Sequence, residues 1–137
     1  MVSEYENAES MIALSRRLSS APVNLVIPGR KIVKQGCLMK VAKNGRTSHS
    51  RFLVLFTDSL MYCKGGAEGP LKFSCLFPLK HCEVEPVLST GVFKITCQDE
   101  EILLYTSNSE EGKEWITKLQ AAVKEVITAF FGFSLSF

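Results

Sequence analysis

Several patterns that identify common protein classes are missing from this sequence. Its 137 residues include five cysteines but no C-x-x-C pair, and only two histidines, so the ligand spacing of a zinc site is absent. No G-x-S-x-G, H-E-x-x-H or phosphate-binding-loop motif indicates an enzyme. No apolar run approaches the roughly 18 to 20 residues that span a bilayer, and the polar N-terminus lacks the apolar segment of a signal peptide. We therefore expect a cytoplasmic protein without catalytic activity, metal ion or cofactor.

The composition and the cysteines are typical of one intracellular globular domain. With 46% hydrophobic and 22% charged residues, a chain of this length can form one core but has little room for a second domain. Each cysteine lies in an apolar run, which predicts buried free thiols in a reducing compartment. The five are Cys37, Cys63, Cys75, Cys82 and Cys97.

The net charge of +2 hides a division along the chain. Between Arg30 and Arg51 there are seven Lys or Arg and no acid, whereas between Asp99 and Glu125 there are seven acids against three lysines. A domain with this division is expected to have a basic end that attracts anions and an acidic end that does not. The alternative is that both regions are ordinary solvated faces. Nucleic acid is not an expected partner, because the charge is only mildly basic and no exposed aromatics alternate with the basic residues.

Short apolar segments separated by turn residues predict a mainly β protein with a helix at each end. Residues 4–18 have the apolar spacing of a short helix, and a linker with two prolines follows to residue 29. Asn44-Gly45 is a strong hairpin signal, because both residue types tolerate positive φ. The seven expected strands are residues 32–41, 51–56, 60–64, 71–79, 82–87, 92–97 and 102–105. Their spacing is typical of an antiparallel barrel or sandwich.

The strand at residues 51–56 is apolar on both faces, so it must be covered twice. We expect the cover to come from a long C-terminal helix at about residues 108–127. Ser107 and Glu110 form an S-x-x-E capping box before it, and its apolar residues recur at three- and four-residue steps. Trp115 lies in this apolar stripe and is expected to be a core residue rather than a ligand-stacking one.

The expected order of strands and helix, together with three sequence motifs, resembles the pleckstrin-homology (PH) domain. Residues 36–40 (GCLMK) resemble the G-x-L-x-K first strand of that family, and residues 51–56 (RFLVLF) resemble its R-[aromatic]-x-V-L second strand. Residues 114–116 (EWI) resemble the E-W-[aliphatic] signature of its helix. The resemblance covers about residues 33–126. It implies a seven-stranded antiparallel barrel or sandwich capped by one C-terminal α-helix, here with a short N-terminal helix.

The flank before the first strand narrows the resemblance. Residues 25–36 (LVIPGRKIVKQG) resemble the junction in Dbl-family Rho guanine-nucleotide exchange factors, where the last helix of the catalytic domain runs into the PH domain. Residues 1–29 would then be the end of a preceding helical domain and a linker, residues 30–129 the PH domain, and residues 130–137 an apolar tail. We expect this phenylalanine-rich tail to pack on the domain, while a bilayer contact, a dimer contact and a sequence peculiar to this chain stay open.

The resemblance also implies an anion-binding site near the first hairpin. Lipid-binding PH domains place a lysine near the end of the first strand and a basic-x-Arg pair at the start of the second. Lys40 and Arg51 match these positions, but His49 stands where the second basic residue is expected and supplies less charge. Lys43 and Arg46 add charge on the connecting loop. Two or three converging cations are what a phosphorylated head group needs.

Together these features imply a non-catalytic PH adaptor domain of a Rho guanine-nucleotide exchange factor. We expect weak peripheral docking to anionic membrane lipids, including phosphoinositides, at about 1 kcal/mol per basic residue near the surface. A Rho-family small GTPase would be a partner through the parent protein. Two alternatives stay open. The domain could bind a protein partner and no lipid, or Lys40 and Arg51 could be merely solvated or paired with Glu83 or Glu85.

Overall fold

The structure, a computed structural model, describes residues 4–19, 25–87 and 91–131. Within these ranges the chain forms two α-helices, seven strands and one turn of 3-10 helix. The elements are α1 (Glu4–Arg17), β1 (Ile32–Val41), β2 (Ser48–Phe56), β3 (Ser59–Lys64), β4 (Lys72–Pro78), η1 (Leu79–His81), β5 (Cys82–Val87), β6 (Val92–Cys97), β7 (Glu100–Tyr105) and α2 (Ser109–Phe131). Neither described helix is long and apolar enough to cross a bilayer.

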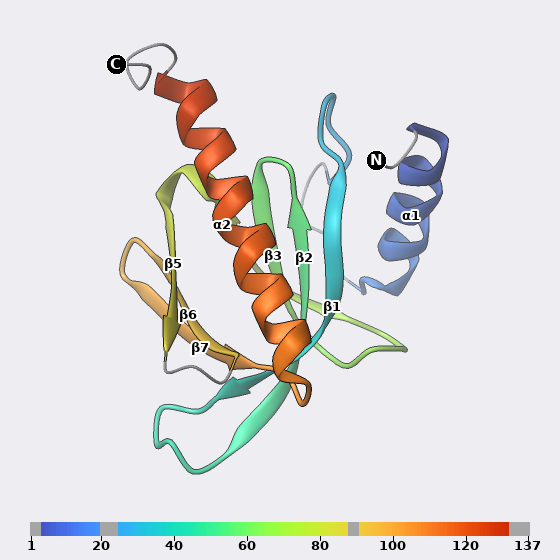
Figure 1. The fold of residues 1–137 in the computed structure, drawn as a ribbon. Helices are drawn as coiled ribbons and strands as arrows, with labels where there is room; N and C mark the ends of the chain where they lie inside the picture. The colour runs from blue at the N-terminus through green and yellow to red at the C-terminus, as the bar shows by residue number, and fades with distance from the viewer. Residues whose placement is uncertain (1–3, 20–24, 88–90, 132–137) are drawn as a thin grey trace.

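The seven strands form one antiparallel sheet in the order β4-β3-β2-β1-β7-β6-β5. Figure 1 shows this sheet bent into two arms, β1–β4 and β5–β7, with α2 lying across them. Within each arm, strands that follow one another in sequence are paired. A short pairing of β1 with β7, in which Lys40 lies opposite Leu104, joins the arms. The expected fold class, with a C-terminal helix and a short N-terminal one, is confirmed.

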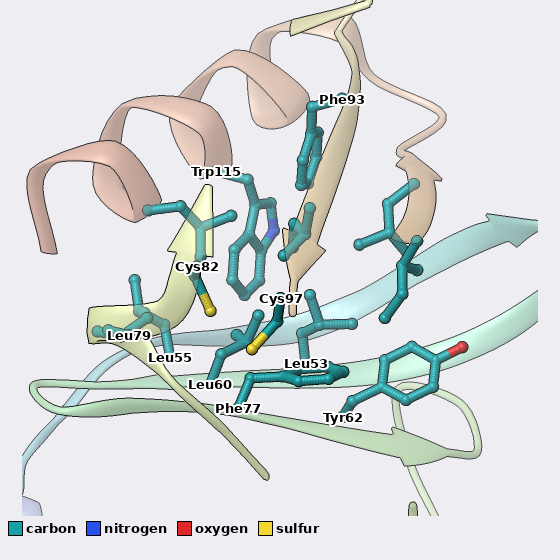
Figure 2. Packing of buried hydrophobic residues seen from close by; sticks show 14 of the residues in the cluster. Leu53, Leu55, Leu60, Tyr62, Phe77, Leu79, Cys82, Phe93, Cys97 and Trp115 are labelled. Atoms are coloured by element: carbon teal, nitrogen blue, oxygen red, sulfur yellow. The ribbon is translucent and has the colours of Figure 1, made fainter. Parts of the chain in front are cut away.

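The inner core lies between the two arms and is closed by α2 (Figure 2). Trp115 of α2 is fully buried and packs with Leu53 and Leu55 of β2 and with Phe93 of β6, which confirms its predicted place in the core. Burial of so large a side chain contributes about 3 to 5 kcal/mol relative to alanine. The other buried members are Leu38, Leu60, Tyr62, Phe77, Leu79, Cys82, Ile95, Cys97, Ile102, Leu104, Leu119 and Ala122.

The outer face of β2 carries a second apolar cluster, which α1 covers. Phe52, Val54 and Phe56 alternate with the inward-facing residues of the same strand and lie in one buried cluster with Met11 and Leu14 of α1. The expectation that the C-terminal helix would supply the cover of this strand was therefore wrong for the outer face. Because side chains alternate across a strand, the two faces need two separate layers, and α2 reaches only the inner one.

Arg30 fastens the linker to the sheet from a buried position. Its Nε and Nη2 donate to the two carboxylate oxygens of Asp58, each at 2.8 Å, and its Nη1 donates to the Leu25 carbonyl at 2.9 Å. The guanidinium carbon also lies 5.2 Å from the centre of the Phe56 ring. The planar guanidinium is suited to such two-pronged pairing and stacking. Arg30 is thus a structural residue, although it begins the basic run.

Two further polar contacts fix α1 on the outer face. Arg17 donates to the carbonyls of Gly66 and Gly69 in the β3–β4 loop, each at 2.9 Å. The side-chain oxygen of Asn7 accepts a hydrogen bond of 2.9 Å from the amide of Ile32, the first residue of β1. These bonds join α1 to the sheet at both of its ends, so the helix and the β1–β4 arm form one unit.

The start of α2 differs from its expected form. The helix spans Ser109–Phe131 and therefore extends beyond its expected end. Its N-cap is Asn108 rather than Ser107, because the Asn108 side-chain oxygen accepts from the Glu110 amide at 2.8 Å. Asparagine is among the strongest N-cap residues, and here it replaces the expected capping box. Residues 132–137 of the apolar tail lie outside the described residues, so their packing stays a prediction.

All five cysteines are free thiols, as predicted. Cys63, Cys82 and Cys97 are buried, whereas Cys37 and Cys75 are only half-buried. Burial raises the pKa of Cys63 and Cys75 to about 11 and that of Cys82 to about 12. These three thiols therefore keep their protons at neutral pH and are weak nucleophiles.

Candidate functional site

The β1–β2 hairpin projects beyond the rest of the sheet, at the bottom of Figure 1. Its turn is built by Asn44 and Gly45, as the sequence predicts. Gly45 has a φ of 72°, which favours glycine, and the Asn44 side-chain oxygen accepts from the Arg46 amide at 2.8 Å. The Ala42 amide closes the loop by donating to the Thr47 carbonyl at 2.9 Å. The hairpin therefore ends in a well-bonded turn that fixes the positions of its side chains.

The five candidate cations all lie on this hairpin. Lys40 of β1 lies directly opposite His49 of β2, and Arg51 shares their face because it is two residues further along the strand. This face continues into the inner core. Lys43 and Arg46 are exposed on the connecting loop. None of the five forms an ion pair with another described residue, so their charges are available to an external anion.

Arg51 is held in place by Tyr62 of β3. Arg51 Nε donates to the Tyr62 hydroxyl oxygen at 3.0 Å, and its Nη1 donates to the Ser50 carbonyl at 2.8 Å. Figure 2 shows the Tyr62 hydroxyl pointing away from the inner core. Burial raises the pKa of Tyr62, although the charge of Arg51 acts in the opposite direction. The phenol therefore keeps its proton at neutral pH, and it can donate that hydrogen while it accepts from Arg51.

A cavity of about 660 Å³ opens beside the hairpin, within the size range of small-ligand sites. Two of the predicted residues, Lys40 and Lys43, line it. Arg51 reaches its wall only through the tyrosine contact. Arg46 and His49 are exposed and do not line it. The structure thus places two of the five candidates in the cavity wall, one in contact with a lining residue, and two on the surface outside it.

Two acids and a third lysine, Lys94, also line the cavity. Glu100 and Glu101 at the start of β7 line it, because β7 pairs with β1 and so brings the acidic stretch beside the basic hairpin. Glu101 makes only a loose ion pair with Lys94, at 3.9 Å. The expectation of a basic end apart from an acidic end does not hold at this cavity. Glu83 and Glu85, the alternative partners, lie on β5 at the edge of the other arm and form no ion pair with the described hairpin cations.

The Cys75 thiol of β4 lines the same cavity as Lys40 and Glu100. Burial is the main cause of its raised pKa, and the hydrogen bond with Ser74 lowers that pKa. The charge of Glu100 raises it further, and the charge of Lys40 lowers it. Charged side chains of both signs and a neutral thiol therefore line this cavity. No group of three His, Cys, Asp or Glu side chains among the described residues could hold a metal ion.

Sequence reasoning missed Tyr62, Ser74, Glu100 and Glu101 as cavity residues. Tyr62 could have been found by alternation, because it shares the inward face of its strand with Leu60. The two acids could not, since their position depends on the pairing of β7 with β1, two strands that are far apart in sequence. Ser74 lies where the register between β3 and β4 shifts. No local pattern in the sequence marks this irregularity, so Ser74 could not have been predicted either.

The fold and the hairpin agree with a comparison against known protein families. Residues 32–124 match the PH domain family. The chain belongs to this family. The matched residues run from β1 into α2, so that α1 and the linker precede the PH domain proper.

Curated relatives of this PH domain carry names of Rho exchange factors. Human "FERM, ARHGEF and pleckstrin domain-containing protein 2" is 30% identical over 125 residues, which are 87% of this chain but 12% of the relative. Mouse "FYVE, RhoGEF and PH domain-containing protein 5" is 30% identical over 105 residues, which are 74% of this chain and 8% of the relative. The PH domain described here thus spans only a small part of the proteins it matches.

Solved structures with the same fold include DH/PH domains of Rho exchange factors. The complex of the PDZ-RhoGEF DH/PH domains with activated RhoA matches with a TM-score of 0.72 at 20% identity, over 88% of this chain and 40% of the other. The activated truncation of Vav1 matches with a TM-score of 0.73 at 15% identity, over 88% of this chain and 33% of the other. At such identities the similarity shows the PH fold alone.

Proposed function

We propose that this PH domain is a non-catalytic adaptor that docks a Rho guanine-nucleotide exchange factor weakly onto anionic phospholipid surfaces, including those with phosphoinositides. The observation that carries the proposal is the set of hairpin cations. Lys40, His49 and Arg51 share one face, and none of them forms an ion pair with a described acid. Lys43 and Arg46 extend the positive charge along the projecting loop, which is the part of the domain that a flat surface can reach first.

Docking of this kind is weak and sensitive to salt. Each basic residue near an anionic surface contributes about 1 kcal/mol, and the attraction falls off within a Debye length. A single domain with a few such residues therefore supports peripheral and reversible attachment at the cytoplasmic face of a membrane. It does not anchor a protein by itself, and further contacts from the parent protein would set the final affinity.

The parent protein is proposed to be an exchange factor, with residues 1–29 as the end of its preceding helical domain and linker, residues 30–129 as the PH domain, and residues 130–137 as an apolar tail. The relatives named above support this. The faces of α1 support it too. Met11 and Leu14 are buried on the sheet, whereas Tyr5 is 73% and Ile12 is 53% exposed. A helix that is apolar on a second side fits a position between the sheet and another layer of helices.

The proposed role in exchange is to support the exchange domain next to its small GTPase. Because Arg17 and Asn7 bond α1 to the sheet, a domain continuous with α1 would be held in a fixed orientation to the PH domain. In a longer parent chain, backbone amides around Ile12 should exchange hydrogen more slowly than in this chain. Equal exchange in both chains would contradict the proposed domain arrangement and leave the lipid proposal untouched.

Sedimentation with vesicles tests the membrane proposal. The domain should sediment with phosphatidylcholine vesicles that contain anionic lipid at low salt, and sedimentation should fall steeply at physiological salt. Vesicles of phosphatidylcholine alone are the matched control. Absence of binding to vesicles with anionic lipids or phosphoinositides at low salt would overturn the proposal and favour the second candidate, a PH domain that binds a protein partner and no lipid.

A further inference from the structure

The cavity beside the hairpin is lined by charged side chains of both signs. Lys40 and Lys43 line it from the hairpin, Glu100 and Glu101 line it from β7, and Lys94 of β6 lines it as well. Glu100 forms no ion pair with a described residue, whereas Glu101 has a loose contact with Lys94 at 3.9 Å. Lys94 therefore offsets part of the charge of Glu101 but leaves that of Glu100. A ligand that enters this cavity meets both lysines and a carboxylate without an ionic partner among the described residues.

Such a cavity is poorly matched to a head group that carries several phosphates. Each additional phosphate brings more negative charge near Glu100, and like charges repel, although the exposure of Glu100 moderates this repulsion. The cavity is better matched to a compact ligand that holds both signs. Such a ligand would place its anionic groups at Lys40 and Lys43 and a cationic group at Glu100.

We propose that this cavity binds the head group of phosphatidylserine, with the phosphate and carboxylate toward Lys40 and Lys43 and the ammonium toward Glu100. The inference rests on the proposed membrane function and names the lipid that the same site prefers. Phosphatidylglycerol has the same net charge but no ammonium. Phosphatidylethanolamine has the ammonium but no net charge. Phosphatidylserine has both an ammonium group for Glu100 and a net negative charge for the lysines of the hairpin.

Two neutral groups complete the site. The Tyr62 hydroxyl accepts from Arg51 at 3.0 Å, so its own hydrogen remains to be donated to a phosphate or carboxylate oxygen. Ser74 contributes a hydroxyl to the same wall, which can both donate and accept. The volume of about 660 Å³ accommodates a phosphoserine head group and leaves the acyl chains outside.

The test compares vesicles of equal surface charge that contain either phosphatidylserine or phosphatidylglycerol. The wild-type domain should bind the phosphatidylserine vesicles about fivefold more tightly, which is the effect of one partly exposed ion pair. Glu100→Gln should abolish that preference and at the same time increase binding to phosphatidylglycerol. Glu83→Gln is the matched control, because it removes an exposed acid on β5 that does not line the cavity. It should leave the preference intact.

The outcomes separate this inference from the proposal on which it rests. Binding to neither vesicle at low salt would overturn both. Equal binding to the two vesicles, or an equal change of preference in Glu100→Gln and Glu83→Gln, would overturn the phosphatidylserine inference alone. Soluble glycerophosphoserine should displace the domain from phosphatidylserine vesicles, whereas glycerophosphoglycerol at the same concentration should not. Equal displacement by both would show that only charge is recognised, and would also overturn the inference.

Discussion

The two halves of the basic stretch between Arg30 and Arg51 have different roles. In the first half, the Arg30 side chain is 7% exposed and bonded to Asp58, and the Lys34 side chain is 16% exposed and bonded to Glu114. In the second half, the cations of the hairpin have no ionic partner among the described residues. The number of basic residues in a stretch of sequence therefore does not give the number of cations that are available to bind a ligand. For Arg30 and Lys34, the fold supplies both an acid and an aromatic ring beside the cation.

The comparison predicts that the first half affects stability and the second half affects binding. Arg30→Ala should have the largest effect, a loss of about 3 kcal/mol in the free energy of unfolding, because it removes a buried paired charge and the contact with Phe56. Urea unfolding followed by Trp115 fluorescence measures it. Arg30→Lys keeps the charge but loses the two-pronged geometry, so it should recover only part of the loss. A loss below that of an average surface substitution would contradict the structural role.

Asp58 makes the same contact sensitive to acid. Burial alone would raise its pKa, but the hydrogen bonds and charge of Arg30 outweigh this and hold the pKa of Asp58 below its ordinary value of 3.8. Because the pKa of Asp58 is lower in the folded state than in the unfolded state, its charge stabilises the fold fully above the unfolded-state pKa. This stabilisation is lost as the pH falls through the folded-state pKa. Asp58→Asn should therefore cost about 2 kcal/mol at neutral pH, a figure reduced for partial exposure, and less in strong acid.

Urea unfolding at neutral and at acidic pH measures this difference. Asp99→Asn is the matched control, because Asp99 is exposed and forms no ion pair with a described residue. The difference in stability between wild type and Asp58→Asn should narrow as the pH falls. A difference that is the same at both pH values would show that the carboxylate charge of Asp58 does not stabilise the fold.

Lys34 offers a smaller test of the first half. Its Nζ donates to the Glu114 carboxylate at 3.1 Å and lies 5.2 Å from the centre of the Trp115 ring. Lys34→Ala should cost about 1 kcal/mol, because the ion pair is partly exposed and the ring contact is weak. The measurement is again the free energy of unfolding. Vesicle binding of the folded variant should equal that of wild type. A clear loss of vesicle binding would contradict the separation of the first half, which affects stability, from the second half, which affects binding.

The sequence was sufficient for the elements whose signals are local. Asn44-Gly45 fixed the hairpin, and the helical stripe around Trp115 located the helix that closes the inner core. The sequence also showed that the second strand is apolar on both faces. It did not show that α1 covers the outer one, because both helices are amphipathic and only the three-dimensional arrangement decides which face each can reach.

The candidate site was predictable only in part. Lys40, His49 and Arg51 follow from the family motif, and the strand register places them on one face of the hairpin. Their contact with an anion stays a prediction. The acids at Glu100 and Glu101 belong to a stretch that looked separate in sequence. They reach the cavity through the pairing of β1 with β7, a contact between distant segments that no local pattern encodes.

His49 gives the smallest expected effect on the second half. If anionic lipid lies against the hairpin, a permanent positive charge at this position should strengthen binding. His49→Lys should therefore bind about twofold to threefold more tightly than wild type. Vesicle titrations of the two proteins measure it. Equal affinity of wild type and His49→Lys would place His49 outside the contact.

The most direct measurement is vesicle binding of Arg51→Ala across a salt series, with wild type and Lys118→Ala beside it. Lys118 is an exposed lysine on α2 without an ionic partner among the described residues, so its loss removes the same charge from an element outside the hairpin. Arg51→Ala should lower binding at low salt about fivefold and flatten the salt dependence. Lys118→Ala should bind as wild type does. Equal binding by all three proteins at every salt concentration would contradict docking through the hairpin.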